Sequence, residues 1–232
     1  MATRVLGGGA ATIAIARVSF TRAMRTRTLY GAAGVAALPI VMASIFTALK
    51  QHEWRSVVEM NVFTSAVLSA LLVAGLIGEE FEDKTMTYLW SRPLPRWSVI
   101  TGKLLALVPM AAAIAAAGVA IALNVALGDD KAPLGRVAIA IAAGTTARAA
   151  IAAAWATLVP KQSVALTIAY LFFFDFPLAV IPARLQAVSL AFHEAQIAGT
   201  VHDESVTSAI IGLCAISAVW LGVALWRVRR IE

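Results

Sequence analysis

The chain has 232 residues, of which 60% are hydrophobic and 14% charged, and its mean hydropathy is +0.83. Soluble domains are about half apolar and about a quarter charged, so this composition excludes an ordinary soluble protein. The net charge of +6 indicates membrane topology first, because no aromatic and basic nucleic-acid-binding motif accompanies it and no nucleic-acid partner is expected. The single cysteine, Cys214, excludes an intrachain disulfide.

Residues 1–28 are a basic leader with apolar residues at helical spacing. Ile13, Phe20 and Met24 share one face, which predicts an amphipathic helix lying on the inner leaflet. Its arginines would anchor it at anionic lipid headgroups, and they are Arg17, Arg22, Arg25 and Arg27. A cleaved signal peptide is the alternative, but it would leave these arginines outside. A disordered basic leader stays open for residues 1–12.

Six long apolar stretches follow, and we expect each to cross the membrane as a helix. They are residues 29–49, 60–77, 104–127, 137–159, 164–181 and 206–226. Stretches this long and continuous do not fit the short alternating strands of a β-barrel. The sequence therefore predicts an all-α integral membrane protein with one transmembrane domain over residues 1–232.

The basic residues predict the orientation of these spans. With the N-terminus in the cytoplasm, 13 of the 19 lysines and arginines fall in cytoplasmic segments and 5 in outer segments, and Arg148 lies within a span. Cytoplasmic loops of membrane proteins carry such an excess. Both termini and the connection between the second and third spans are thus expected on the cytoplasmic side.

That connection, residues 78–103, reads GEEFEDKTMTYLWSRPLPRWSVITGK. It begins with an acidic cluster, which the dipole of a helix C-terminus does not favour, so we expect either a partner or a new helix here. Pro93 and Pro95 end that helix, and Arg96 and Trp97 form an interfacial anchor before the third span. A short membrane-parallel helix with an aromatic edge is a docking surface, whereas the plain alternative is a solvated loop.

Two spans contain one charge each, Arg148 and Asp175. Both are equally far from the tight turn at residues 160–162, so an antiparallel hairpin would bring them level near the middle of the bilayer. We predict an intramembrane ion pair, because an unpaired charge costs about 2.5–3.5 kcal/mol there. Two roles stay open for it, a gate or substrate contact and a pin that locks the hairpin.

Residues 182–204 contain a further amphipathic pattern, which predicts an outer interfacial or re-entrant helix that ends at Gly199, with a plain loop as the alternative. His52-Glu53 and His193-Glu194 do not complete an H-E-x-x-H zinc motif and are expected to be solvated in outer loops. In the fifth span, an aromatic run could partly line a pathway, although packing or lipid contact is the plainer role. The candidates are Phe172, Phe173 and Phe176.

The residues around the connection resemble the signature of ABC-2-type transporter permeases. These are Glu80, Asp83-Lys84-Thr85, Leu89, Arg92-Pro93, Arg96 and Gly102-Lys103, with Lys84 where the family usually has glycine. The six spans and the leader fit the same family. The resemblance implies the transmembrane subunit of a type V exporter-like ABC transporter, in a bacterial cytoplasmic membrane. It also implies that two permease copies, identical or sisters, pair with ATPase subunits.

Within this resemblance, residues 79–97 would be the coupling segment that docks on the ATPase. Its contact residues would be Glu79, Glu80, Phe81, Asp83, Thr85, Tyr88, Leu89, Arg92 and Arg96. The chain has no G-x-x-x-x-G-K-[ST] loop, so ATP and Mg would bind to the partner ATPase, and no catalytic, cofactor-binding or metal-binding residue is expected here. A secondary transporter, an intramembrane enzyme and a permease-like scaffold are the alternatives.

Overall fold

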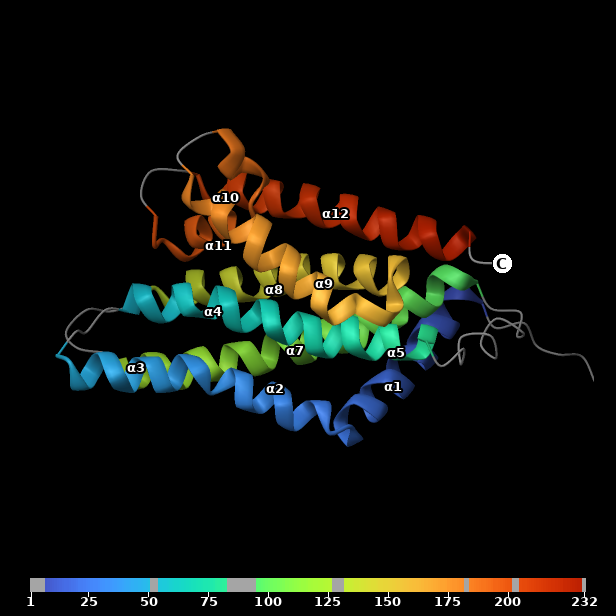
Figure 1. Ribbon diagram of the computed structural model, residues 1–232, viewed down its shortest axis with the longest axis horizontal. Coiled ribbons are helices and arrows are strands. Elements are labelled where there is room, and N and C mark those ends of the chain that lie inside the picture. Colours follow the sequence, from blue (N-terminus) through green and yellow to red (C-terminus); the bar gives the residue numbers. More distant parts are fainter. Residues whose placement is uncertain are drawn as a thin grey trace, which may run out of the picture.

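The computed structural model describes residues 7–50, 54–82, 95–126, 132–181, 184–201 and 205–230, and these residues form a bundle of long helices (Figure 1). Six helical stretches in this part of the chain are long and apolar enough to cross a bilayer. They are Thr28–Ala48, Trp54–Glu82, Arg96–Val125, Leu134–Leu158, Pro160–Val180 and Val206–Arg230. The predicted all-α membrane architecture with six spans is therefore confirmed.

Several spans are built from more than one helical segment. The first consists of α2 (Thr28–Ala36) and α3 (Leu38–Ala48), which meet next to Pro39. The second joins α4 (Trp54–Ser69) and α5 (Leu76–Glu82) through a π-helical turn, η1 (Ala70–Gly75). The fifth has the order η2 (Pro160–Gln162), α9 (Ser163–Tyr170), the π-helical η3 (Leu171–Asp175) and α10 (Phe176–Val180).

The remaining spans are single helices, α7 (Arg96–Ala126), α8 (Leu134–Leu158) and α12 (Val206–Arg230). The α8 helix lies at the centre and contacts α4, α7, α9, α11 (Leu190–Ala198) and α12. Its buried face is rich in alanine, including the run from Ala152 to Ala154. Small residues let helix backbones approach closely, so this face suits a central position in a membrane bundle.

One end of the bundle gathers segments that are far apart in the sequence. Figure 1 shows α1 (Gly8–Arg25), α5, the beginning of α7 and the C-terminal end of α12 at the same end. The α3 end of the first span, α10 and α11 lie at the opposite end. This arrangement places the leader and the C-terminal end of α12 where the second span ends and the third begins. Which side of the membrane this end faces stays a prediction.

The leader is helical over α1 and packs on α7, where Gly102 leaves room for it. A Cβ on Gly102 would stand 2.7 Å from the carbonyl oxygen of Thr12, which is too close for a side chain. The larger apolar side chains of α1, among them Ile13, Val18 and Phe20, remain exposed. An exposed apolar face is what a lipid interface would cover, and the interfacial location stays a prediction.

The segment after the fifth span differs in detail from the expected single helix. It consists of a 3₁₀ segment, η4 (Arg184–Val188), and then α11, with Ser189 between them. The α11 helix ends at Gly199, whose φ of 82° lies in the left-handed region that suits glycine. Most of α11 is buried against α8 and α12.

Candidate functional site

Arg148 is a fully buried cation in the central α8 helix, with 0% of its surface exposed. It forms an ion pair with Glu194 of α11, which is 1% exposed. Its Nη1 also donates a hydrogen bond to Ser65 Oγ of α4 at 2.8 Å. Arg148 thus joins three helices that are distant in the sequence, and each of its contacts supplies an acceptor inside the bundle.

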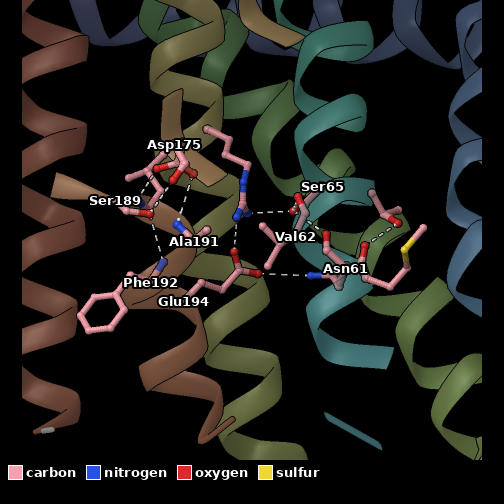
Figure 2. Close-up of polar contacts among 12 residues, drawn as sticks. Asn61, Val62, Ser65, Asp175, Ser189, Ala191, Phe192 and Glu194 are labelled. Carbon is pink, nitrogen blue, oxygen red and sulfur yellow. Dashed lines mark hydrogen bonds and ion pairs between the residues drawn. The ribbon is translucent and has the colours of Figure 1, made fainter. Parts of the chain in front are cut away.

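Asn61 extends this network along α4. Its Nδ2 donates to Glu194 Oε1 at 3.3 Å, and Ser65 Oγ donates back to the Asn61 carbonyl oxygen at 2.7 Å. Figure 2 shows Glu194 reaching from α11 toward Asn61 and the neighbouring Ser65. Glu194 therefore contacts both the guanidinium and an amide, as a buried carboxylate requires.

The predicted direct ion pair between Arg148 and Asp175 is wrong. Arg148 pairs with Glu194, whereas Asp175 accepts hydrogen bonds from two backbone amides of α11, Leu190 N at 2.6 Å and Ala191 N at 3.2 Å. The first amides of a helix have no partner within the helix and carry partial positive charge. Asp175 therefore takes its direct hydrogen bonds from a helix terminus, whereas Arg148 makes its direct ion pair with Glu194.

The α11 helix is held by polar groups at both ends. At its beginning, Ser189 Oγ accepts from Phe192 N at 3.3 Å and donates to the Asp175 carbonyl oxygen at 3.0 Å. At its end, Arg136 donates to the carbonyl oxygens of Ile197 at 3.0 Å and Gln196 at 2.9 Å. A carboxylate at the N-terminus and a guanidinium at the C-terminus both match the helix dipole.

The position of Glu194 is shaped by its surroundings in α8. Gly144 lies one turn before Arg148, and a Cβ at Gly144 would collide with the Glu194 carboxylate. Burial raises the pKa of Glu194, while the charge of Arg148 lowers it and that of Asp175 raises it further. Two carboxylates and one guanidinium thus interact electrostatically at this end of the bundle.

The sequence reasoning missed Glu194. We expected His193 and Glu194 to be solvated, and the structure contradicts this, because both side chains are buried. His193 hydrogen bonds to the Ala187 carbonyl oxygen at 3.0 Å and to Gln196 Oε1 at 3.3 Å. The available signal was the glycine at position 144, one turn from a buried arginine, which makes room for a partner from another helix.

The aromatic run of the fifth span divides between two surroundings. Phe172 and Phe176 pack on Phe63 of α4, with ring centroids 5.2 and 4.5 Å apart. Phe173 is 76% exposed on the outside of the protomer. Adjacent residues point to different sides of a helix, so the three rings do not share one surface. A pathway role for any of them stays a prediction.

A second charged cluster lies at the opposite end of the bundle, where the second span ends and the third begins. Glu80 of α5 forms ion pairs with Arg22 of α1 at 2.7 Å and with Lys103 of α7 at 2.5 Å. Glu79 is 3.9 Å from Arg22. The Lys103 side chain is buried, but those of Arg22 and Glu79 are about half exposed. The cluster joins the leader to the second and third spans.

The predicted coupling residues fall partly in this cluster. Glu79, Glu80 and Phe81 lie in the last turns of the second span, so the acidic residues continue that helix, and Arg96 begins α7. Asp83, Thr85, Tyr88, Leu89 and Arg92 lie outside the described residues. Of the predicted anchors, Arg17, Arg22 and Arg25 are on α1, and Arg27 precedes α2.

The charged groups of these two clusters interact mainly with one another and with helix termini, which suits holding helices in place. In the part of the chain that the structure describes, no three His, Cys, Asp or Glu residues are grouped to hold a metal ion.

Comparison with protein families matches residues 21–213 to a family described as "ABC-2 family transporter protein". A search of curated proteins found no match.

Proposed function

Since the chain belongs to the ABC-2 family of transporter proteins, we propose that it is the membrane-spanning permease subunit of an ABC transporter. The match covers residues 21–213 and includes five complete spans and part of the sixth. This extent is the observation that carries the proposal. The subunit moves a substrate out across a bacterial cytoplasmic membrane, and a separate ATPase subunit binds ATP and Mg and supplies the energy.

The orientation follows from the charge distribution and the shape of the bundle. One end holds α1, α5, the start of α7 and the C-terminal end of α12 (Figure 1). Most of the basic residues lie in these segments or next to them, including Arg227, Arg229 and Arg230 in the last turn of α12. The positive-inside tendency favours the cytoplasm for this end. Residues 79–97 then face the ATPase.

The Arg22–Glu80–Lys103 cluster gives this end a means of transmitting force. Glu80 lies just before the proposed ATPase contact, and its two ion pairs connect α5 to α1 and α7. A displacement of residues 79–97 is therefore passed to the leader and to the third span together. In this proposal, Glu79, Glu80, Phe81 and Arg96 act at the base of the coupling segment.

Assembly with a second permease completes the proposal. Six spans of one protomer form a closed bundle around α8, whose central face is filled with alanine. A gated route is then expected between two protomers, either identical or sister subunits. Native mass measurement of the purified complex tests this, and a complex with one permease copy contradicts it.

The main experiment is co-purification of the chain with the ATPase encoded beside it, followed by ATPase assays in liposomes. We expect a complex, and a crosslinker placed at Tyr88 should reach the ATPase. Charge reversal by Glu80→Lys should weaken assembly or uncouple ATP hydrolysis from transport. Glu59→Lys is the matched control for assembly with the ATPase, because Glu59 lies near the start of α4, at the opposite end of that span from α5. If no ATPase associates and Tyr88 never crosslinks, the permease proposal is wrong.

A further inference from the structure

A groove of about 480 Å³ opens at the end of the bundle opposite the Arg22–Glu80–Lys103 cluster. Its walls come from α3, α4, α10 and α11, and we call it the Glu59 groove after the acidic residue in its lining. Its volume falls within the range of pockets that hold small organic ligands, about 300–1,000 Å³. The groove is thus large enough for a compact drug-sized molecule.

The lining of the Glu59 groove combines apolar rings with one negative charge. Phenylalanine and methionine side chains supply most of the wall, including Met42, Phe46, Met60, Phe63, Phe176 and Phe192. Among the described residues that line it, Glu59 is the single ionisable side chain, and none is Lys, Arg or His. The ring faces add to the negative character, because aromatic rings attract cations.

Glu59 has no internal cation to neutralise it within the described ranges. The ion pairs in this part of the chain involve Glu79, Glu80 and Glu194, and Glu59 takes part in none of them. The nearby Arg55 places its guanidinium over the Trp54 ring at 5.8 Å and does not line the groove. Among the described residues, the groove therefore offers a carboxylate without an ion-pair partner beside a cluster of rings.

Part of the groove lining is held in place by the buried network described above. Ala191 and Phe192, which line it, lie at the beginning of α11, where Asp175 and Ser189 accept their amide hydrogens. Phe63 and Phe176 also line the groove and contact each other. Because these walls are held by hydrogen bonds and ring packing, the groove exists before a ligand arrives, which lowers the entropy cost of binding.

From these features we propose that the Glu59 groove binds amphipathic organic cations of small size, and that these are a substrate class of the transporter. The rings and methionines contact the apolar body, while Glu59 and the ring faces attract the positive charge. An anion meets no lining cation, and a neutral acyl chain leaves the carboxylate unpaired. The assignment as substrate rests on the proposed transport function, whereas the binding site itself does not.

Two ions of matched size and opposite charge give a direct test. The purified chain is placed in nanodiscs of zwitterionic lipid, and binding of tetraphenylphosphonium is compared with binding of tetraphenylborate by equilibrium dialysis. We expect the cation to bind more tightly. Glu59→Gln should weaken cation binding about fivefold, the upper end for a partly exposed ion pair, without weakening anion binding. Glu59→Lys should reverse the preference.

Glu82→Gln is the matched control, because it removes one negative charge at the far end of the same span and should leave both affinities unchanged. Equal binding of the two ions, or a Glu59→Gln variant that binds the cation as well as the natural chain, overturns the proposal. This is the result expected if an acyl chain or a second copy of the chain fills the groove.

The same samples separate this proposal from the transport function. If the cation does not bind but the chain still assembles with an ATPase, the groove assignment fails and the permease function stands. If the cation binds in a Glu59-dependent way but no ATPase associates, the binding site stands and its role in ATP-driven transport falls.

Discussion

The two ends of the bundle use similar charged groups in different surroundings. At one end, Arg148 and Glu194 are fully buried and their partners come from α4, α8 and α11. At the other, Glu80 joins a buried Lys103 to an Arg22 whose side chain is 46% exposed. Water cannot replace a partner of Arg148 or Glu194, because both are buried. In the Glu80 cluster, water can reach Arg22. The comparison indicates a fixed end around α11 and an adjustable end where the second span ends and the third begins.

The largest effect is expected from breaking the Arg148–Glu194 pair. Glu194→Leu leaves a permanently charged guanidinium buried without its carboxylate, which should cost about 3–5 kcal/mol in the free energy of unfolding. The double variant Arg148→Leu with Glu194→Leu removes both charges and should recover most of this loss. Thermal unfolding in detergent measures both. A double variant no more stable than Glu194→Leu contradicts the pairing.

The next effect concerns the two amides that Asp175 holds. Asp175→Ala removes the acceptor for Leu190 N and Ala191 N and should cost about 1–3 kcal/mol. Amide hydrogen exchange should become faster at the start of α11. Asp175→Asn keeps one acceptor oxygen and should lose less. If exchange rises equally throughout the bundle in Asp175→Ala, the cap does not act locally.

At the adjustable end, Glu80→Gln is expected to have a moderate effect. The variant removes the negative charge that faces the buried Lys103 and should lower the free energy of unfolding by about 1–2 kcal/mol. The cost is moderate because the flexible lysine side chain can carry its ammonium group toward water. Lys103→Met with Glu80→Gln should be more stable than Glu80→Gln alone. Unfolding in detergent gives the comparison, and a further loss in the double variant argues against the pair.

The smallest effect on stability is expected from Arg22→Gln. The pair of Arg22 with Glu80 is partly exposed, so its loss should cost less than about 1 kcal/mol. If the cluster transmits motion from the proposed ATPase contact, transport per ATP hydrolysed should nevertheless fall. Arg17→Gln is the control, because Arg17 lies on the same helix and forms none of the ion pairs seen among the described residues. Equal coupling in the two variants removes the special role of Arg22.

Periodicity and length were enough to predict the six spans, because a bilayer requires about 20 apolar residues per helix whatever the tertiary contacts. The need for compensation of Arg148 and Asp175 also followed from the sequence, since a charge within a span is costly. The residues that partner Arg148 and Asp175 could not be predicted from the sequence. Glu194 and the amides of α11 belong to a segment with an ordinary amphipathic pattern, and its burial depends on contacts with α8 and α12.

The Arg22–Glu80–Lys103 cluster illustrates the same limit. Each residue had a local interpretation, as a lipid anchor, an ATPase contact or the start of a span. Their meeting depends on how α1 crosses α7, which is set by the close approach at Gly102. Helix propensity and charge count carry no information on such a crossing, whereas a glycine at the start of an apolar helix is a weak sign of it.

The π-helical turn at residues 171–175 has a consequence for changes in chain length. A π-helical turn contains one more residue than an α-helical turn, so it absorbs one residue while the helix on either side keeps nearly the same rotation. Deleting one residue inside this turn would restore a regular α-helix and leave α10 near its present rotation. Deleting one residue from α9 while the π turn is kept would turn α10 by about 100°. In that second variant Phe176 would leave Phe63, and Asp175 would no longer face the start of α11. The fifth span should therefore tolerate loss of a residue inside this turn better than loss of one before it.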